Sequence, residues 1–400
     1  MNVNSLQTAS LVKTGADRLL ANEIDRIKNK RIGILTNHTG CLSNGTHIVD
    51  AIVESNAVSV TALFGPEHGI LGNTPDGKVV NHSTDSRYHI PIYSLYGKIH
   101  KPTPEMLSNI DLLLCDIQDV GTRFYTFIST IAMAVEGAAE NGIPVLILDR
   151  PNPIRGVSFD GPVRNQKLKS FVAWMPIPVT HGMTIGELAI LWNEEGQLGG
   201  GVRASLEVLP LQGWNRNMWY DETGLPWIAP SPNMPSMTTA VLYPGLCFIE
   251  GTTISEGRGT DSPFELIGAP WLNTENVISV LNDFQLSGVQ FSSEEFIPKE
   301  IPGMVSEPKY EGEVCKGIRI KVHDRNSVEP VRLGIYLLLA LKKIHPKEAQ
   351  LNHRRFDILT GDSSVRKMLE GGEQPEKIFS RWSNDLQEFG KIRSRYLLYD

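Results

Sequence analysis

The stretch of this 400-residue chain that is richest in reactive side chains is Phe64-Gly65-Pro66-Glu67-His68-Gly69. A carboxyl group and an imidazole stand side by side there, directly after the apolar run from Val58 to Phe64. Glycine and proline fix the backbone of such a turn, whereas Glu and His are side chains that transfer protons. The alternative is a capping Glu beside a hydrogen-bonded core His. We treat Glu67 and His68 as candidate catalytic residues.

Polar residues also follow three other strand-like runs of the first 150 residues. Asn37 and His38 come after the first run, Asp116, Asp119, Arg123 and Tyr125 after the third, and Arg150 after the fourth. Because the carboxyl ends of parallel strands meet at one edge of a sheet, these side chains predict a polar cleft. Asp116 and Asp119 are the candidates for a second catalytic carboxylate, and their alternative role is capping of the helix that follows.

Several familiar site motifs are absent from the sequence. No Gly-x-Gly-x-x-Gly follows the first strand, no P-loop is present, and no Gly-x-Ser-x-Gly marks a serine nucleophile. His38, His181 and His323 lack the spacing of metal ligands, so we expect neither a metal nor another cofactor. The remaining carboxylate-rich set suits general acid/base hydrolysis of a glycosidic bond.

The elements that must position these residues alternate between strand and helix. Strands are predicted over 31–36, 58–64, 111–117 and 145–148, and helices over 47–54, 124–141 and 185–195. The last helix begins with a capping box, Thr184-x-x-Glu187. Continuous apolar strands separated by helices predict the α/β class, with a parallel sheet covered on both faces.

A proline-rich stretch predicts a domain boundary. Three prolines interrupt residues 227–235, which therefore form neither a helix nor a central strand. We place a first domain at 1–235 and a second at 236–400. Strands predicted over 287–292 and 317–323, with helices over 274–284, 331–344, 363–370 and 378–389, make the second a smaller α+β domain.

Composition bounds the class of protein and its partners. An apolar content of 41%, a charged content of 21% and a net charge of −7 are those of a soluble globular protein without a basic footprint for nucleic acid. No apolar run has the length of a membrane span. The first 30 residues do not read as a signal peptide, so we expect a cytoplasmic location, or a secreted or periplasmic one if a signal was trimmed.

Four long motifs together resemble the NamZ family of exo-β-N-acetylmuramidases, formerly a domain of unknown function. They span residues 64–69, 116–125, 148–153 and 250–260, and the likeness runs from about Arg31 to the C-terminus. The resemblance implies a Rossmann-like catalytic domain, a smaller C-terminal domain and a site in the cleft between them. It also implies a cell-wall-recycling glycosidase that releases terminal non-reducing N-acetylmuramic acid from muropeptides or MurNAc-GlcNAc fragments. The family's catalytic Glu maps onto Glu67.

The expected substrate adds further candidates. Arg123, Arg150 and Arg258 could bind the lactyl carboxylate of muramic acid, because Arg pairs bidentately with carboxylates. Asn37, His38, Tyr125, Asn233, Glu250 and Glu256 complete the predicted substrate-binding set. We expect the 250–260 motif to face Glu67 across the interdomain cleft.

Two alternatives stay open at this level. One is a metal-dependent hydrolase with Asp116, Asp119 and His68 as ligands, and the other is a muropeptide-binding module without turnover. The sequence also leaves open the stereochemical course, the second catalytic group and the preferred substrate length. It does not decide the oligomeric state either, and a homo-oligomer is one possibility.

Overall fold

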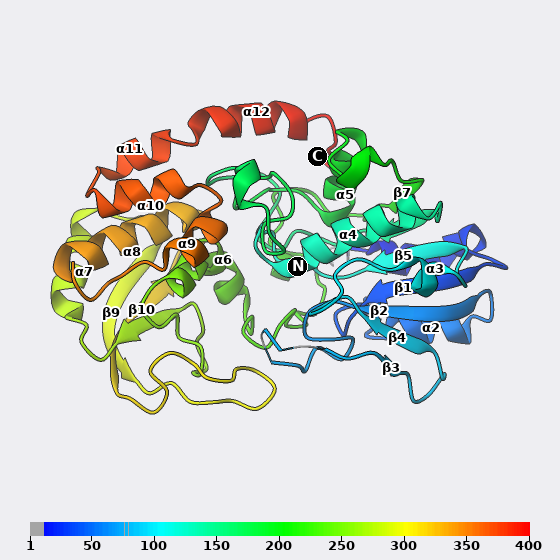
Figure 1. Ribbon diagram of the computed structural model, residues 1–400, viewed down its shortest axis with the longest axis horizontal. Coiled ribbons are helices and arrows are strands. Elements are labelled where there is room, and N and C mark those ends of the chain that lie inside the picture. Colours follow the sequence, from blue (N-terminus) through cyan, green and yellow to red (C-terminus); the bar gives the residue numbers. More distant parts are fainter. Residues whose placement is uncertain (1–11, 76, 79) are drawn as a thin grey trace, which may run out of the picture.

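The computed structural model describes residues 12–75, 77, 78 and 80–400. Two parts lie side by side, a larger N-terminal part built on a mostly parallel sheet and a C-terminal part built on a smaller antiparallel sheet (Figure 1). None of the described helices combines the length and apolar character that a membrane crossing requires.

The N-terminal part contains a seven-stranded sheet in the order β3-β4-β2-β1-β5-β6-β7. Its strands are β1 Arg31–Thr36, β2 Ser59–Gly65, β3 Ser83–Thr84, β4 Pro91–Ser94, β5 Leu112–Asp116, β6 Val145–Leu148 and β7 Leu206–Leu209. All neighbours run parallel except β3 and β4. The sequence predicted β1, β2, β5 and β6. It missed β3, β4 and β7, because these short strands lie at or near the sheet edges and lack a continuous apolar run.

Alternate residues of the central strands pack into two different cores. In β5, Leu113 and Cys115 face one core and Leu112 and Leu114 face the other. Helices α4 Thr126–Glu140 and α5 Ile185–Glu194 cover the first face, and α1 Gly15–Arg18 and α2 Ile48–Glu54 cover the second. The predicted parallel sheet with two covered faces is confirmed.

Helix α5 begins as the sequence predicts. The Thr184 hydroxyl accepts from the backbone N–H of Glu187, and the Glu187 side chain accepts from the backbone N–H of Thr184. A short helix α3, Pro104–Leu107, precedes β5. Single turns occupy Leu19–Glu23, Ile24–Arg26, Gln166–Leu168, Gly199–Gly201, Tyr220–Glu222 and Cys247–Gly251.

The C-terminal part is the α+β unit expected from the sequence. Strands β8 Leu266–Ala269, β9 Val289–Phe296 and β10 Cys315–Val322 form an antiparallel sheet in the order β8-β10-β9. Its helices are α6 Met237–Leu246, α7 Thr274–Asp283, α8 Pro330–Ile344, α9 His353–Thr360, α10 Ser363–Glu370, α11 Pro375–Ser380 and α12 Ser383–Arg393.

The helix predicted over 378–389 is two helices, so that prediction is wrong. The chain breaks at Trp382, whose backbone is not helical (φ −110°, ψ 4°). The break lets the indole enter the core and donate its Nε1–H to Asp160 in the N-terminal part, 3.0 Å away. Burial of a large aromatic side chain outweighs the continuity of one helical turn.

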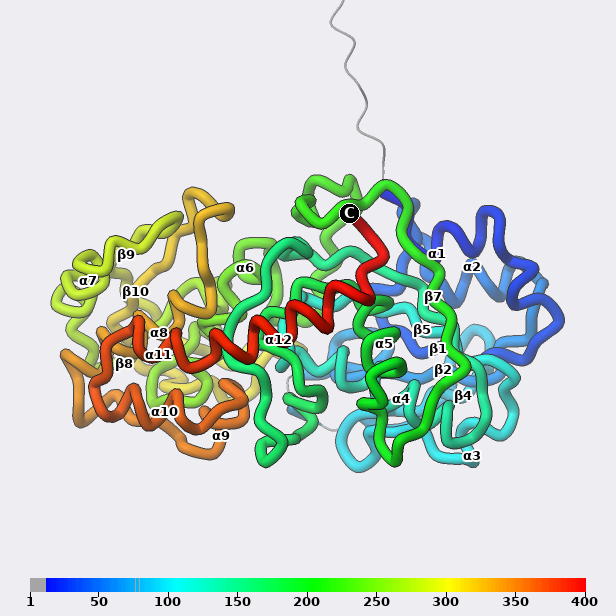
Figure 2. Tube along the Cα trace, turned by 90° about the horizontal axis from the view of Figure 1, so that it is seen from above, coloured from blue at the N-terminus to red at the C-terminus, as the bar shows by residue number. Residues whose placement is uncertain are grey.

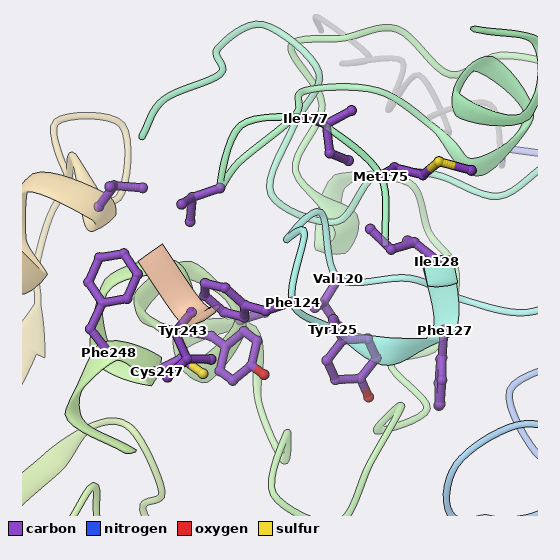
Figure 3. Packing of buried hydrophobic residues seen from close by; sticks show 14 of the residues in the cluster. Val120, Phe124, Tyr125, Phe127, Ile128, Met175, Ile177, Tyr243, Cys247 and Phe248 are labelled. Atoms are coloured by element: carbon purple, nitrogen blue, oxygen red, sulfur yellow. The ribbon is translucent and has the colours of Figure 1, made fainter. Parts of the chain in front are cut away.

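One continuous apolar core joins the two parts. Phe124 from the N-terminal part lies with its ring centre 5.4 Å from that of Tyr243 and 6.0 Å from that of Phe248 (Figure 3). Helix α12 then crosses back from the C-terminal part, and the chain ends against the N-terminal part (Figures 1 and 2). The proposed boundary after Pro235 falls just before α6, and it stays a prediction.

Candidate active site

A cavity of about 160 Å³ lies where the two parts meet. Its N-terminal wall comes from the turn after β2, the start of α4 and the Pro-rich segment before α6. Its C-terminal wall comes from α6, the turn that follows α6, the 250–260 motif and α9. Its lining includes Glu67, His68, Tyr125, Thr126, Ser231, Asn233, Tyr243, Glu250, Arg258 and Arg355.

Glu67 is held in a fixed orientation at this cavity. Its side chain is buried, and the Thr126 hydroxyl donates to its Oε2 at 2.6 Å. The backbone N–H of Gly77 donates to the other oxygen, Oε1, at 3.3 Å. Thr126 is the first residue of α4, so the carboxyl group also stands at the positive end of a helix dipole.

His68 occupies a strained position beside Glu67. Its φ of +67° lies in the left-handed region, which is uncommon for a residue other than glycine. The ring Nδ1 lies 2.7 Å from the carbonyl oxygen of Thr74 and therefore carries the hydrogen. In the neutral ring, Nε2 is then unprotonated and able to accept a hydrogen bond from a ligand. Backbone strain of this kind is common at functional sites.

The opposite wall carries a cluster of three charged side chains. Glu250 accepts from Arg258 Nη2 at 2.9 Å through one oxygen and from Arg355 Nη2 at 2.5 Å through the other. Burial by itself would raise the pKa of Glu250, but the two guanidinium groups outweigh burial and lower this pKa to about 2. Glu250 is therefore ionised at any ordinary pH. Glu250 and Arg258 of the 250–260 motif thus line the same cavity as Glu67.

Glu256 lies behind this cluster and does not line the cavity. Its carboxylate accepts from Lys309 Nζ at 2.9 Å and approaches Arg258 Nε at 3.5 Å. It supports Arg258 from the side away from the cavity.

Asn233 and Tyr125, two predicted substrate-binding residues, do line the cavity. The Asn233 side chain donates to the carbonyl of Met304 at 3.1 Å, and its buried Oδ1 has no hydrogen-bond donor among the described residues. The Tyr125 ring packs edge-on against Phe127 and Tyr243.

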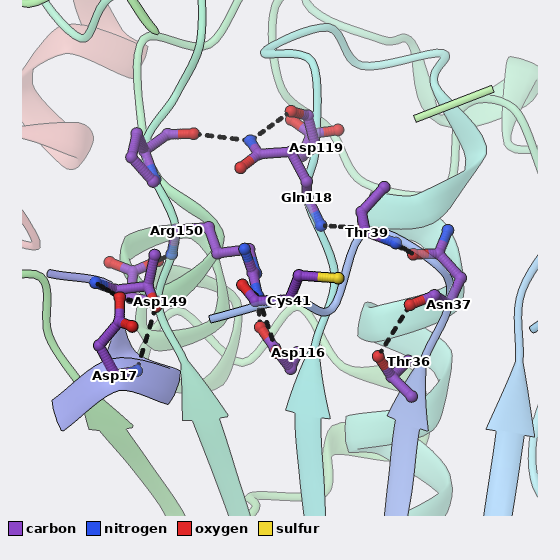
Figure 4. Close-up of polar contacts among 12 residues, drawn as sticks. Asp17, Thr36, Asn37, Thr39, Cys41, Asp116, Gln118, Asp119, Asp149 and Arg150 are labelled. Carbon is purple, nitrogen blue, oxygen red and sulfur yellow. Dashed lines mark hydrogen bonds and ion pairs between the residues drawn. The ribbon is translucent and has the colours of Figure 1, made fainter. Parts of the chain in front are cut away.

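Asp116 and Arg150 lie at a different place, the edge between β1 and β5 (Figure 4). The strand order reverses there, and ligands of open α/β sheets usually bind at such a point. In this protein the two residues pair with each other instead, with Arg150 Nε 2.5 Å and Nη2 2.9 Å from the Asp116 oxygens. Tyr220, Leu225, Pro226 and Ile228 line this edge and leave a cavity of only about 10 Å³. The structure therefore does not bring Asp116 or Arg150 to the Glu67 cavity.

Asp119, Asn37 and His38 also lie outside the Glu67 cavity. Asp119 accepts from the backbone N–H of Gly121 at 2.7 Å and lies 3.4 Å from Nε2 of the buried His181. Asn37 Oδ1 accepts from the N–H and O–H groups of Thr39 (Figure 4). His38 Nε2 bonds the carbonyl of Ala229 at 2.8 Å, and burial lowers the pKa of this imidazole. These contacts hold loops together.

Arg123 is a fully buried cation that joins the two parts of the molecule. Its Nη1 donates to the carbonyls of Pro162 and Ile177 at 2.5 and 2.9 Å, and its Nη2 donates to the carbonyl of Leu359 in α9 at 2.8 Å. Burial lowers its pKa to about 9. The sequence predicted a substrate contact, whereas the structure places Arg123 behind the cavity, between segments that line it.

The ligand set of the metal-hydrolase alternative is not assembled. His68 lines the cavity, but Asp116 and Asp119 are engaged elsewhere. Within residues 12–75, 77, 78 and 80–400, no three His, Cys, Asp or Glu side chains are grouped closely enough to hold a metal ion.

Sequence reasoning missed Thr126 and Arg355. Thr126 directly follows the motif that ends at Tyr125, and its place as the first residue of α4 was the available signal. Arg355 carries no motif. Asn352 caps α9, so the helix could have been found, but nothing local indicated that Arg355 faces the cavity.

Comparison with known proteins identifies the family of this chain. Residues 32–238 match the family described as exo-beta-N-acetylmuramidase NamZ, N-terminal, and residues 241–399 match its C-terminal counterpart. The peptidoglycan beta-N-acetylmuramidase NamZ of Bacillus subtilis (strain 168) is 44% identical over 389 residues, which cover 97% of this chain and 91% of that protein.

Two crystal structures of DUF1343 family proteins from Bacteroides fragilis NCTC 9343 share the fold. One has a TM-score of 0.89 at 34% identity and covers 97% of this chain and 99% of its own. The other has a TM-score of 0.80 at 36% identity and covers 98% and 99%. Because its two parts match the N-terminal and C-terminal family models, and the Bacillus subtilis relative is similar along nearly the whole of this chain, the chain belongs to the NamZ family of exo-β-N-acetylmuramidases.

Proposed function

We propose that this protein is a glycoside hydrolase that releases terminal non-reducing N-acetylmuramic acid from peptidoglycan fragments, with Glu67 as the general acid. Family membership and the activity named for the Bacillus subtilis relative support the reaction. One observation carries the assignment of Glu67: its buried carboxyl group lines the interdomain cavity and is oriented by the Thr126 hydroxyl at 2.6 Å.

In the proposed reaction, protonated Glu67 donates its proton to the glycosidic oxygen as the bond from that oxygen to C1 breaks. The remaining fragment leaves as an alcohol, water supplies the new hydroxyl group at C1, and the other proton of that water returns Glu67 to its protonated form through solvent. Thr126 and the Gly77 N–H group fix the plane of the carboxyl group. His68, with Nδ1 occupied by Thr74, has Nε2 left to orient a sugar hydroxyl group or a water molecule.

No second carboxylate is assigned. Asp116 and Asp119 lie outside the cavity, and Glu250 is the other acidic side chain among the described lining residues. Because Glu250 has a pKa of about 2, it does not act as the proton donor, and both of its oxygens accept hydrogen bonds from the two arginines.

The test is the variant Glu67→Gln, which keeps the shape of the side chain and removes its proton. Release of N-acetylmuramic acid from a chromogenic β-N-acetylmuramide should fall at least about 100-fold, the lower range for loss of a general acid. Binding of the MurNAc-GlcNAc disaccharide, followed by calorimetry, should stay close to that of the unmutated protein.

Glu136→Gln is the matched control, because Glu136 is a buried glutamate on α4 that does not line the cavity. A Glu67→Gln variant that keeps more than about a tenth of the activity would exclude Glu67 as the acid. Absence of release by the unmutated protein would favour the binding-module alternative, and loss of release on chelation would revive the metal-hydrolase alternative.

A further inference from the structure

The charges that line the cavity do not cancel. The charged side chains among its described lining residues are Glu67, Glu250, Arg258 and Arg355. Glu67 is neutral when it is ready to donate a proton, and Glu250 neutralises one arginine. The wall opposite Glu67 therefore has an excess of one positive charge, which a ligand with a single carboxylate would balance.

Arg258 is already enclosed by protein. Its Nη2 bonds Glu250, its Nε lies 3.5 Å from Glu256, and its guanidinium lies over the Phe264 ring at 5.1 Å. Its side chain is only 12% exposed. Such a guanidinium, contacted on one face and along two edges, is a fixed part of the wall.

Arg355 is different. Its side chain is 44% exposed and lines the cavity, and Glu250 is the one partner of its guanidinium among the described residues. Glu250 occupies one of the two Nη groups. A guanidinium has five N–H donors in a planar fork that matches a carboxylate, so Arg355 keeps donors for a ligand.

The position of Arg355 relative to Glu67 is also fixed by protein contacts. Asn352 caps the helix by accepting from the backbone N–H of Arg355. At the other end of α9, the carbonyl of Leu359 accepts from Arg123 of the N-terminal part. Glu250 holds the side chain itself, so the cation is positioned before a ligand arrives.

From this arrangement, and resting on the function proposed above, the structure assigns recognition of the substrate's 3-O-lactyl carboxylate to Arg355. Glu250 positions Arg355, and Arg258 holds Glu250 in place. The C-terminal part thus contributes Arg355, which selects muramic acid over N-acetylglucosamine, whereas the N-terminal part contributes Glu67, the proposed general acid.

The experiment compares two chromogenic muramides, one with the free lactyl carboxylate and one in which that group is a methylamide. Arg355→Ala should lower kcat/KM on the free acid about 30-fold or more, mainly through KM, because a charge-assisted pair between the guanidinium and the lactyl carboxylate is lost. On the methylamide the loss should stay below about threefold, since the partner charge is already absent. Arg355→Lys, which keeps the charge but not the fork, should be intermediate on the free acid.

Arg354→Ala is the matched control, because Arg354 is exposed on the same helix and does not line the cavity. It should leave both rates unchanged. Equal losses on the two muramides after Arg355→Ala, or no loss on either, would overturn the assignment.

A second readout separates this inference from the proposed reaction. Glu67→Gln should bind N-acetylmuramic acid more tightly than N-acetylglucosamine, and adding Arg355→Ala should abolish the difference. If the unmutated protein hydrolyses neither muramide, the proposed function fails. The binding comparison then still decides whether Arg355 binds the lactyl carboxylate. A preference that survives in the double variant would overturn the role of Arg355.

Discussion

Glu250 shows how a residue without a chemical step can shape a site. Its carboxylate bridges two arginines that come from segments about a hundred residues apart in the chain, Arg258 and Arg355. A buried charge is tolerated only when it is paired and hydrogen-bonded, and here both oxygens are occupied. The cluster therefore contributes to stability as well as to the charge of the cavity.

The pH dependence of stability should report this cluster. The pKa of Glu250 falls from 4.5 to about 2 on folding, so its contribution is present above about pH 4.5 and is lost as pH falls toward 2. We expect the free energy of unfolding of the unmutated protein to exceed that of Glu250→Gln by about 3 kcal/mol at pH 7, with the gap closing below pH 4.5.

Urea unfolding at several pH values measures this difference. Glu313→Gln provides the comparison, because Glu313 is exposed and the same substitution there should show no such gap. A difference for Glu250→Gln that is constant between pH 7 and pH 3 would contradict the linkage argument.

At the scale of elements, segments that the sequence predicts to be mere connections contribute residues to the cavity. The proline-rich segment 227–235 reads as a boundary between domains, yet Ser231, Asn233 and Met234 line the Glu67 cavity. Pro226 and Ile228, from the same region, line the small cavity at the edge between β1 and β5. With so little space at this edge, Asp116 and Arg150 pair with each other.

The loop between β5 and α4 depends on Arg123, which bonds three carbonyls from three segments. Arg123→Lys should destabilise the protein by about 2–3 kcal/mol, because one ammonium group cannot reach all three carbonyls and hydrogen bonds from a charged donor are worth ~1.5–3 kcal/mol each. Activity should also fall, since Thr126 and Arg355 both lie on elements that Arg123 joins.

Thermal unfolding and kcat/KM on a muramide test this prediction. Arg203→Lys is the control, because the Arg203 side chain is 63% exposed and the substitution there should change neither quantity. Unchanged stability of Arg123→Lys would show that the three carbonyls do not depend on the guanidinium fork.

At the scale of the whole molecule, the two parts are held together in two ways. One apolar core continues from the N-terminal sheet into α6, α8 and α9. Figure 3 shows the part of it that contains Phe124, Tyr243 and Phe248. The C-terminal residues then return to the N-terminal part (Figure 2), where the Tyr399 hydroxyl donates to the buried Asp149 at 2.5 Å and accepts from the backbone N–H of Leu211. We expect the parts to unfold in one transition.

Tyr399→Phe should lower stability by about 2 kcal/mol or more, because it leaves a buried carboxyl group and a buried N–H group each without one partner. Calorimetry should still show a single transition. Tyr396→Phe removes a half-buried hydroxyl group from the same tail and should cost less. Two separate transitions in the unmutated protein, or equal effects of the two substitutions, would contradict this account.

The sequence by itself determined the elements with strong local signals. Unbroken apolar runs predicted β1, β2, β5 and β6, and the Thr184–Glu187 capping box predicted the start of α5, because these signals arise from contacts within one element. The motifs around Glu67 and Glu250 were also legible, since their glycines, carboxylates and arginines stand close together in the chain.

Only the tertiary structure decided which polar side chains share the cavity. Residues at neighbouring strand ends are equivalent in sequence, but Asp116 and Arg150 pair with each other beside Pro226 and Ile228. Glu67 instead lines a cavity that it shares with Arg355 of α9. Arg355 joins the site through packing of the C-terminal part, and Trp382 interrupts a helix to reach Asp160. Such outcomes depend on contacts between residues far apart in the chain, which local pattern does not encode.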